Sequence, residues 1–144
     1  MAGYSYTRLI QKLGIKPGAA LTVINPPSHY AKLLGRLPEG VHLETGLKRA
    51  CQFVHVFTKD RDELKKYLVR LRSTLADTGT IWISWPKKSS SVETSVTENV
   101  IRDLALPLGF VDTKVCAVDE TWSGLKLIIR RANRKTTKNE AAIS

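Results

Sequence analysis

The chain has 144 residues, of which 42% are hydrophobic and 25% charged, and its formal net charge is +10. This length suits one domain, and no apolar run approaches the roughly 18 residues that a membrane-spanning helix needs. The N-terminus lacks the basic start and apolar stretch of a secretion signal. The two cysteines, Cys51 and Cys116, are too far apart to form a Cys-x-x-Cys site or to indicate a disulfide framework. We therefore expect a cytoplasmic protein without membrane contact.

The net charge is the one unusual feature of the composition. A strongly positive protein favours nucleic acid, anionic lipid or an acidic protein as a partner. Part of the excess lies near the C-terminus, where residues 130–138 contain arginines and lysines and few apolar residues. Such a stretch cannot bury enough apolar surface to fold by itself. We expect residues 1–131 to form one domain and residues 132–144 to be a basic, disordered tail.

The first half of the chain alternates helical and extended patterns. A short helix is expected to end at Gly14, a second at Gly35 and Pro38, and a central strand is marked by its β-branched and aromatic residues. The patterns predict a helix over residues 7–13, a strand over 21–25, a helix over 30–37 and strands over 41–45 and 53–57.

The second half continues this alternation and closes with two strands. Asp60 with Glu63, and Ser95 with Glu98, have the spacing of capping boxes, and each precedes apolar residues at helical spacing. The predicted elements are a helix over residues 60–75, a strand over 80–85, a loop over 87–91, a helix from 95 to 108 and strands over 111–119 and 125–131.

Strands that alternate with helices predict an α/β fold with a largely parallel sheet, and the last two strands predict an antiparallel hairpin. No internal repeat or linker divides the chain. We therefore expect one three-layer, Rossmann-like α/β domain, with a mostly parallel sheet of about six strands and a C-terminal antiparallel hairpin.

The segment Lys12-Leu13-Gly14-Ile15-Lys16-Pro17-Gly18, placed between the first helix and the first strand, resembles the Rossmann-like fold of S-adenosylmethionine-dependent methyltransferases. The likeness extends over most of residues 7–131 and implies a glycine-rich cofactor loop after the first strand. Residues 25–28 here are Asn-Pro-Pro-Ser. The prolines remove N–H donors and the freedom to adopt positive φ. We therefore expect a methyltransferase-like fold that lacks this loop and binds no cofactor.

A second resemblance extends over nearly the whole chain. Residues 2–5, 12–18, 85–88 and 118–126 are similar to those of a family of small bacterial proteins known only as a domain of unknown function. The resemblance implies a bacterial, cytoplasmic protein, and it implies no established activity or catalytic residue.

Asn25-Pro26-Pro27, with Tyr30 shortly after it, resembles the motif that holds the target base in amino-group methyltransferases. In those enzymes the motif ends the central strand, whereas here it ends the first strand. The structural alternative is a rigid turn that Asn25 caps.

Glu44 is the candidate for binding a cofactor ribose. It lies 19 positions after Asn25, and a Rossmann-type acid is expected about 20 residues after the cofactor loop. The alternative is an incidental acid near the end of the second strand.

Trp85-Pro86-Lys87-Lys88 closes a strand at the carboxyl edge, where open α/β sheets bind ligands. Asn25, Thr58 and Lys87 could share one groove there, in which Lys87 and Lys88 would bind an anion. The alternative is that both lysines keep a serine-rich loop soluble.

The remaining candidates are weaker. Trp122 is either a plug over the end of the sheet or an exposed contact, and the three histidines have no metal-ligand spacing. A basic helix region favours nucleic acid, but an aromatic stacking platform is not visible. Its basic residues are Lys59, Arg61, Lys65, Lys66, Arg70 and Arg72.

The leading hypothesis is a non-catalytic binding or interaction domain for a small anionic ligand or a protein partner. Its candidate ligand-binding residues are Asn25, Glu44, Thr58, Trp85, Lys87 and Lys88. One alternative is a divergent methyltransferase that uses S-adenosylmethionine, with Glu44 for the cofactor and Asn25 for orientation. The other is a nucleic-acid-binding protein that uses its basic surface and tail.

Overall fold

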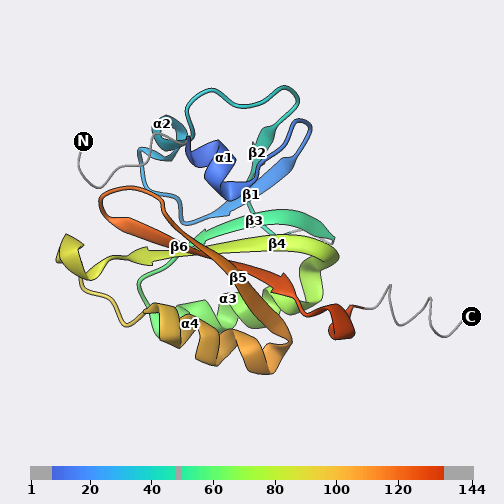
Figure 1. The fold of residues 1–144 in the computed structure, drawn as a ribbon, viewed down its shortest axis with the longest axis vertical. Helices are drawn as coiled ribbons and strands as arrows, with labels where there is room; N and C mark the ends of the chain where they lie inside the picture. The colour runs from blue at the N-terminus through green and yellow to red at the C-terminus, as the bar shows by residue number, and fades with distance from the viewer. Residues whose placement is uncertain (1–7, 48–49, 135–144) are drawn as a thin grey trace, which may run out of the picture.

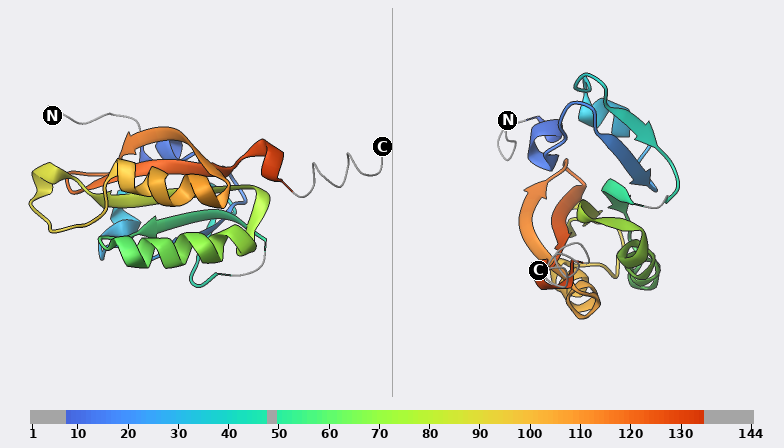
Figure 2. Two further views of the ribbon diagram at one scale, coloured as in Figure 1. Left: turned by 90° about the horizontal axis from the view of Figure 1, so that it is seen from below. Right: turned by 90° about the vertical axis from the view of Figure 1, so that its right-hand side faces the viewer.

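The computed structural model describes residues 8–47 and 50–134, and this part of the chain forms a six-stranded sheet between two helical layers. Helices α1 (Leu9–Leu13) and α2 (Tyr30–Leu34) lie on one side of the sheet. Helices α3 (Arg61–Thr74) and α4 (Glu98–Ala105) lie on the other, as Figures 1 and 2 show. The predicted three-layer α/β fold is confirmed.

The strands are β1 (Ala20–Ile24), β2 (His42–Glu44), β3 (Cys51–Phe57), β4 (Leu75–Pro86), β5 (Phe110–Ala117) and β6 (Trp122–Ile129). Their order in the sheet is β2-β1-β3-β4-β6-β5. The first four are mutually parallel, and β6 pairs antiparallel with both β4 and β5. The predicted C-terminal hairpin is therefore confirmed, with β6 as its inner strand.

The direction of winding reverses between β1 and β3. From β1 the chain continues through α2 to β2 at one edge, and it then returns to β3 on the opposite side of β1. The carboxyl ends of β1 and β3 therefore flank a topological switch point, which is where open α/β sheets bind ligands. Asn25 and Thr58 are the first residues after these two strands.

Each face of the sheet has its own apolar core, because side chains of a strand alternate between the two faces. Val54 and Val56 of β3 pack under α3 and α4, whereas Phe53 and Phe57 pack under α1 and α2. Trp82 joins the second core, and its indole Nε1–H donates to the carbonyl of Leu13 at 2.9 Å. This hydrogen bond fixes the end of α1 on the sheet.

Helix α3 begins at the predicted cap, because the Asp60 carboxylate accepts a hydrogen bond from the Glu63 N–H at 2.8 Å. The Glu63 carboxylate does not return to the cap. It accepts hydrogen bonds from Thr58 and Asn25 instead. Of the two hydrogen bonds of the expected capping box, the one to the Asp60 carboxylate is thus formed. The Glu63 carboxylate, which should make the other, bonds to residues at the switch point.

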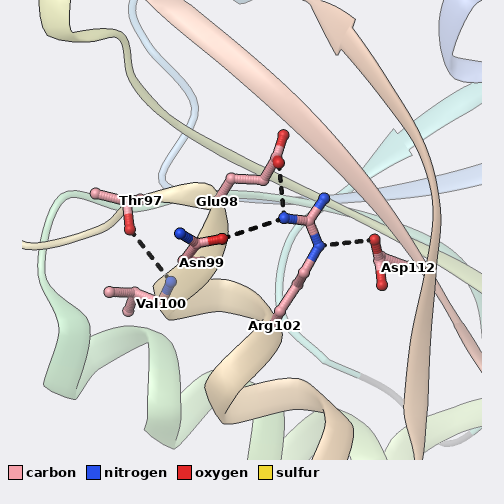
Figure 3. A network of polar contacts seen from close by, with 6 residues as sticks. All are labelled: Thr97, Glu98, Asn99, Val100, Arg102 and Asp112. Carbon is pink, nitrogen blue, oxygen red and sulfur yellow. Dashed lines mark hydrogen bonds and ion pairs between the residues drawn. The ribbon is translucent and has the colours of Figure 1, made fainter.

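The capping box predicted at Ser95 and Glu98 is wrong. Thr97 caps α4, since its hydroxyl accepts from the Val100 N–H at 3.2 Å, and the Ser95 hydroxyl instead accepts from the N–H of Arg61. Glu98 forms an ion pair with Arg102 at 2.7 Å, shown in Figure 3. The Ser95 hydroxyl thus bonds to the start of α3, and the Glu98 carboxylate bonds to a residue one turn further along α4.

Arg102 also ties α4 to the edge strand β5. Its Nε–H donates to Asp112 at 2.9 Å, and the Nη1–H donates to Asn99 (Figure 3). The hydrogen bond from Arg102 holds the pKa of the Asp112 carboxyl below its usual value, and both carboxylates raise the pKa of Arg102. The network orients α4 along the sheet.

The element bounds differ from prediction where a side chain closes a turn. The turn before β6 is shorter than the expected residues 120–124, because the Asp119 carboxylate accepts from the N–H groups of Thr121 and Trp122. Strand β4 begins at Leu75 rather than at residue 80, and α2 ends at Leu34.

No described helix is long and apolar enough to cross a membrane. The predicted tail reaches the described residues only through Arg134, and residues 135–144 lie outside them.

Candidate functional site

The switch point is organised by Asn25, the residue that follows β1. Its backbone is left-handed, with φ of 55°, a conformation that asparagine tolerates better than most residues. Its side-chain Nδ2 group donates to Glu63 Oε1 at 3.3 Å and to the Tyr67 hydroxyl at 3.1 Å. The loop after β1 is therefore fixed to helix α3.

Thr58, the residue that follows β3, meets the same carboxylate. Its hydroxyl donates to Glu63 Oε1 at 3.0 Å, and its backbone N–H donates to the Ser84 carbonyl. The structure thus brings Asn25 and Thr58 together through Glu63, which the sequence analysis did not select. The capping-box spacing assigns the Glu63 side chain to the helix cap, and no sequence pattern pointed to its contact with Asn25.

A cavity of about 380 Å³ opens beside Asn25, at the carboxyl ends of β1 and β2. Arg70 is the one charged residue among its described lining residues, and Asn25, Thr45 and Tyr67 supply polar groups. The remaining lining residues are Val23, Ile24, Pro26, Gly46 and Leu47. We call this space the β1–β2 cavity.

A second hollow of about 500 Å³ lies along α3 and shares Tyr67 and Arg70 with the β1–β2 cavity. Its lining includes the carboxylates of Asp60, Asp62 and Glu63, and Lys66 is a second cation beside Arg70. The carboxylates outnumber the cations, which makes this hollow less favourable for an anion than the β1–β2 cavity. An anionic group would therefore approach Arg70 from the side of the β1–β2 cavity.

The loop that follows Asn25 differs from a cofactor cradle. Pro26 and Pro27 have no N–H groups, and α2 begins directly after them, with the Tyr30 N–H donating to the Pro27 carbonyl at 3.0 Å. The Asn25 side chain also extends to α3 from the place where a glycine would leave space. These residues do not fit a cofactor that must pack against bare backbone at this point.

A buried polar chain lies behind this loop, on the α1 and α2 face. The Tyr30 hydroxyl lies 2.8 Å from His55 Nδ1, and His55 Nε2 lies 2.7 Å from the Ser84 hydroxyl. All three side chains are buried, and burial lowers the pKa of His55 from 6.5 to about 3. The imidazole is therefore neutral and closed to solvent.

A second contact holds the same loop from outside. His29 Nε2 lies 2.9 Å from Asp119 Oδ2, which joins the loop to the turn between β5 and β6. Next to this turn, the Trp122 ring packs edge-on against Phe57 with centroids 5.0 Å apart. Trp122 is half-buried, and its contact with Phe57 favours the plug over the exposed contact as its role. Among the described residues, no group of histidines, cysteines and carboxylates could hold a metal ion.

The other predicted site residues lie apart from Asn25. Glu44 is level with Thr22 of β1 and contacts His42 at 3.1 Å, and it is not part of the described lining of the β1–β2 cavity. Trp85 is buried in the core that faces α3 and α4.

The two lysines of the Trp85-Pro86-Lys87-Lys88 segment also point to other surroundings. The Lys87 N–H donates to the Thr121 carbonyl at 2.7 Å, and Lys88 begins a short 3-10 helix, Lys88–Ser90. Lys88 lines a separate hollow with Trp85 near the start of α4. The structure therefore does not bring Lys87 and Lys88 into the cavity beside Asn25.

Several solved methyltransferase structures have the same fold. A candidate type 11 methyltransferase from Sulfolobus solfataricus is 12% identical, with a TM-score of 0.61 over 87% of this chain and 91% of that chain. A SAM-dependent methyltransferase from Aquifex aeolicus is 11% identical, with a TM-score of 0.61 over 84% and 87%. Aeropyrum pernix fibrillarin in complex with S-adenosyl-L-methionine is 11% identical, with a TM-score of 0.55 over 88% and 70%. The protein thus has a Rossmann-like, methyltransferase-type fold.

The family is defined by a sequence model described as "Protein of unknown function (DUF3052)", which matches residues 43–131. This match covers more than half of the chain, and the protein belongs to that family. No curated protein matches the chain. The two resemblances found in the sequence, one to methyltransferases and one to a family of unknown function, are both confirmed.

Proposed function

We propose that this domain is a non-catalytic binding module whose ligand site is the β1–β2 cavity. The observation that carries the proposal is the position of this cavity, beside the topological switch point and at the carboxyl ends of two parallel strands. Open α/β sheets use this position to bind ligands. Its volume of about 380 Å³ is within the usual range of small-molecule sites.

The lining favours a small ligand with an anionic group and a short apolar body. Arg70 offers a planar cation that suits a carboxylate or phosphate, and the amide of Asn25 and the hydroxyls of Thr45 and Tyr67 offer hydrogen bonds. Val23 and Leu47 are among the residues that would contact the apolar body. We thus still propose an anion near Asn25, but the residue that would bind it is Arg70 and not Lys87 or Lys88.

A binding role agrees with the chemistry of the surrounding groups. The Glu63 carboxylate, which Asn25 contacts, accepts hydrogen bonds from Asn25 and Thr58. The buried imidazole of His55 is already engaged by Tyr30 and Ser84. The described lining of the cavity itself contains no carboxylate, histidine or lysine, side chains that commonly serve as general bases.

The first experiment is a calorimetric and thermal-shift titration of the purified chain with small carboxylates and organic phosphates. Ligand at about 100 times its dissociation constant adds roughly 2.7 kcal/mol, which raises the midpoint by several degrees. Arg70→Gln should weaken binding about tenfold, because charge-assisted hydrogen bonds contribute about 1.5–3 kcal/mol. Lys65→Gln is the matched control, since Lys65 is exposed on the same helix and is not among the described lining residues. Equal loss in both variants, or no saturable binding by any probe, would contradict the proposal.

The fold of the solved methyltransferases, one of which is in complex with S-adenosyl-L-methionine, supports a second candidate function. The same titration should therefore include S-adenosylmethionine and S-adenosylhomocysteine. Saturable micromolar binding that is lost in Glu44→Ala would replace the non-catalytic proposal with a divergent methyltransferase. Because the Asn25-Pro26-Pro27 loop does not fit the cofactor, we expect no shift at millimolar concentrations.

A third candidate function, nucleic-acid binding, can be distinguished from small-ligand binding by how its affinity depends on salt concentration. Binding to phosphate backbones weakens steeply as salt rises, because counterions are released. The exposed face of α3 interleaves Asp62 with Arg61, Lys65 and Lys66. Such a mixed face gives a weaker positive field than a purely basic one. We therefore expect little affinity for oligonucleotides at physiological salt.

A further inference from the structure

Another cavity, of about 260 Å³, lies at the opposite end of the parallel strands, beside the end of α1 and the amino ends of β1 and β3. Leu13 and Phe53 give it an apolar floor, and Thr80 and Gln52 add polar groups. Lys16 and Lys126 supply two positive charges, and no carboxylate is among its described lining residues. We call this space the amino-edge cavity.

More positive charge gathers next to this cavity. Lys114 of β5 lies directly opposite Lys126 of β6 in the sheet register, and like charges in such a pair are destabilising. The ammonium group of Lys12 lies further from the cavity, at the Ala117 carbonyl of β5 (3.2 Å), which is level with Trp85 of β4 rather than with Thr80. The ion pairs between described residues include none of these lysines. Lys16, Lys126 and the neighbouring Lys114 thus have no neutralising partner in the described chain.

The setting of Lys126 makes this charge useful for binding. Its side chain is half-buried on the same face as Trp82, its partner in the β4–β6 register. A partly desolvated ammonium interacts more strongly with an anion than an ammonium in open water does. Lysine also binds phosphate well as a point charge.

We propose that the amino-edge cavity is a second binding site, which takes a small phosphorylated molecule with an apolar group next to its phosphate. Lys16 and Lys126 hold the phosphate, and the apolar group lies on Leu13 and Phe53. The hollow shape and apolar floor select a compact ligand over the backbone of a nucleic acid, which binds along an open basic groove. The site is at the opposite end of the strands from the β1–β2 cavity, so its proposal stands independently of the proposed function.

The cavity contains its own spectroscopic reporters. The Trp82 indole N–H donates to the carbonyl of Leu13, a residue of the cavity floor, and the Gln52 side-chain amide donates to Thr78. Both groups carry nitrogen-bound protons that are visible by NMR. A ligand on this floor should move these two signals in a saturable manner.

The test is an NMR titration of the purified chain with phenyl phosphate, inorganic phosphate and phenol. Phenyl phosphate should move the Trp82 and Gln52 signals and bind more tightly than inorganic phosphate, because it alone uses the apolar floor, whereas phenol should not bind measurably. Lys126→Gln should weaken phenyl phosphate about tenfold, since it removes a charge-assisted hydrogen bond. Lys16→Gln is the second variant, for the case in which Lys126→Gln does not fold.

The controls separate this site from the rest of the surface. Lys65→Gln on α3, a surface lysine outside both cavities, should leave the phenyl phosphate titration of the Trp82 and Gln52 signals unchanged. Unmoved Trp82 and Gln52 signals, or equal weakening in Lys65→Gln and Lys126→Gln, would overturn the inference. It would also be overturned if a single-stranded oligonucleotide moved these signals while phenyl phosphate did not. A failure of the proposed function would be seen in a different measurement, the calorimetric titrations of the parent chain and Arg70→Gln, and it would leave the Trp82 and Gln52 signals of this test unaffected.

Discussion

The buried imidazole of His55 should make the folded protein sensitive to mild acid. Tyr30 and Ser84 hydrogen-bond both of its ring nitrogens, and burial lowers its pKa from 6.5 to about 3. In the unfolded chain this imidazole regains its ordinary pKa and binds a proton below about pH 6.5. Protonation thus favours the unfolded state, and the contribution of neutral His55 to stability is lost progressively as the pH falls from 6.5 toward 3.

The size of this loss follows from the difference between the two pKa values. Each pKa unit corresponds to 1.36 kcal/mol, so between pH 7 and pH 4.5 the free energy of unfolding should fall by about 2.5 kcal/mol through His55 alone. In a domain of this length, that loss lowers the thermal midpoint by several degrees. Carboxylates contribute separately, and a variant without the imidazole is needed to subtract them.

Urea unfolding followed by circular dichroism at several pH values measures this contribution. His55→Gln keeps a polar side chain but cannot be protonated, so its stability should fall less steeply below pH 6.5 than that of the parent chain. His42→Gln is the matched control, because His42 is an exposed histidine on the neighbouring part of the sheet. If parent and His55→Gln had the same pH dependence, our account of His55 would be wrong. NMR of the imidazole nitrogens is a second test, since His55 should still be neutral at pH 5.

Two further predictions concern the ends of the helices. Asp60→Ala removes the acceptor for the Glu63 N–H and should lower the free energy of unfolding in urea by about 1 kcal/mol. Asp62→Ala, also in the first turn but exposed, should lower it less. An equal loss in both variants would show that the cap is not the cause. Arg102→Gln removes the hydrogen bond that lowers the pKa of Asp112, so an NMR titration of the Asp112 carboxyl should give a higher pKa in this variant. An unchanged pKa would mean that Arg102 does not set it in solution.

The fold was predictable because the strongest patterns are local. The β-branched and aromatic run at residues 53–57 and the apolar face of residues 60–75 each need only their own periodicity to be assigned, and both became β3 and α3. The alternation of strands and helices then restricts the topology to a mostly parallel sheet. The less certain bounds are those at which a side chain such as Asp119 closes the turn.

The candidate site was predictable in its position and not in its composition. The rule that ligands bind at the carboxyl ends of strands selected Asn25 and Thr58, which the structure places on one carboxylate. Tyr67 and Arg70 reach the same place only because of how α3 packs on the sheet, which brings Tyr67 to Asn25, and the sequence does not contain that packing register. The two predicted capping boxes also have the correct spacing, but the Glu63 carboxylate bonds to Thr58 and to the distant Asn25, and the Glu98 carboxylate pairs with Arg102 one helical turn further on.

The loop from Asn25 to Tyr30 is attached to three different parts of the fold. Asn25 is bound to α3, His29 to the turn before β6, and Tyr30 to the buried centre of the sheet. A loop attached in this way has little conformational freedom left to lose when a ligand arrives. The wall of the β1–β2 cavity next to Asn25 would therefore be preformed before the ligand binds. Association then needs no slow rearrangement of this wall, and the cavity excludes molecules of the wrong shape instead of adapting to them.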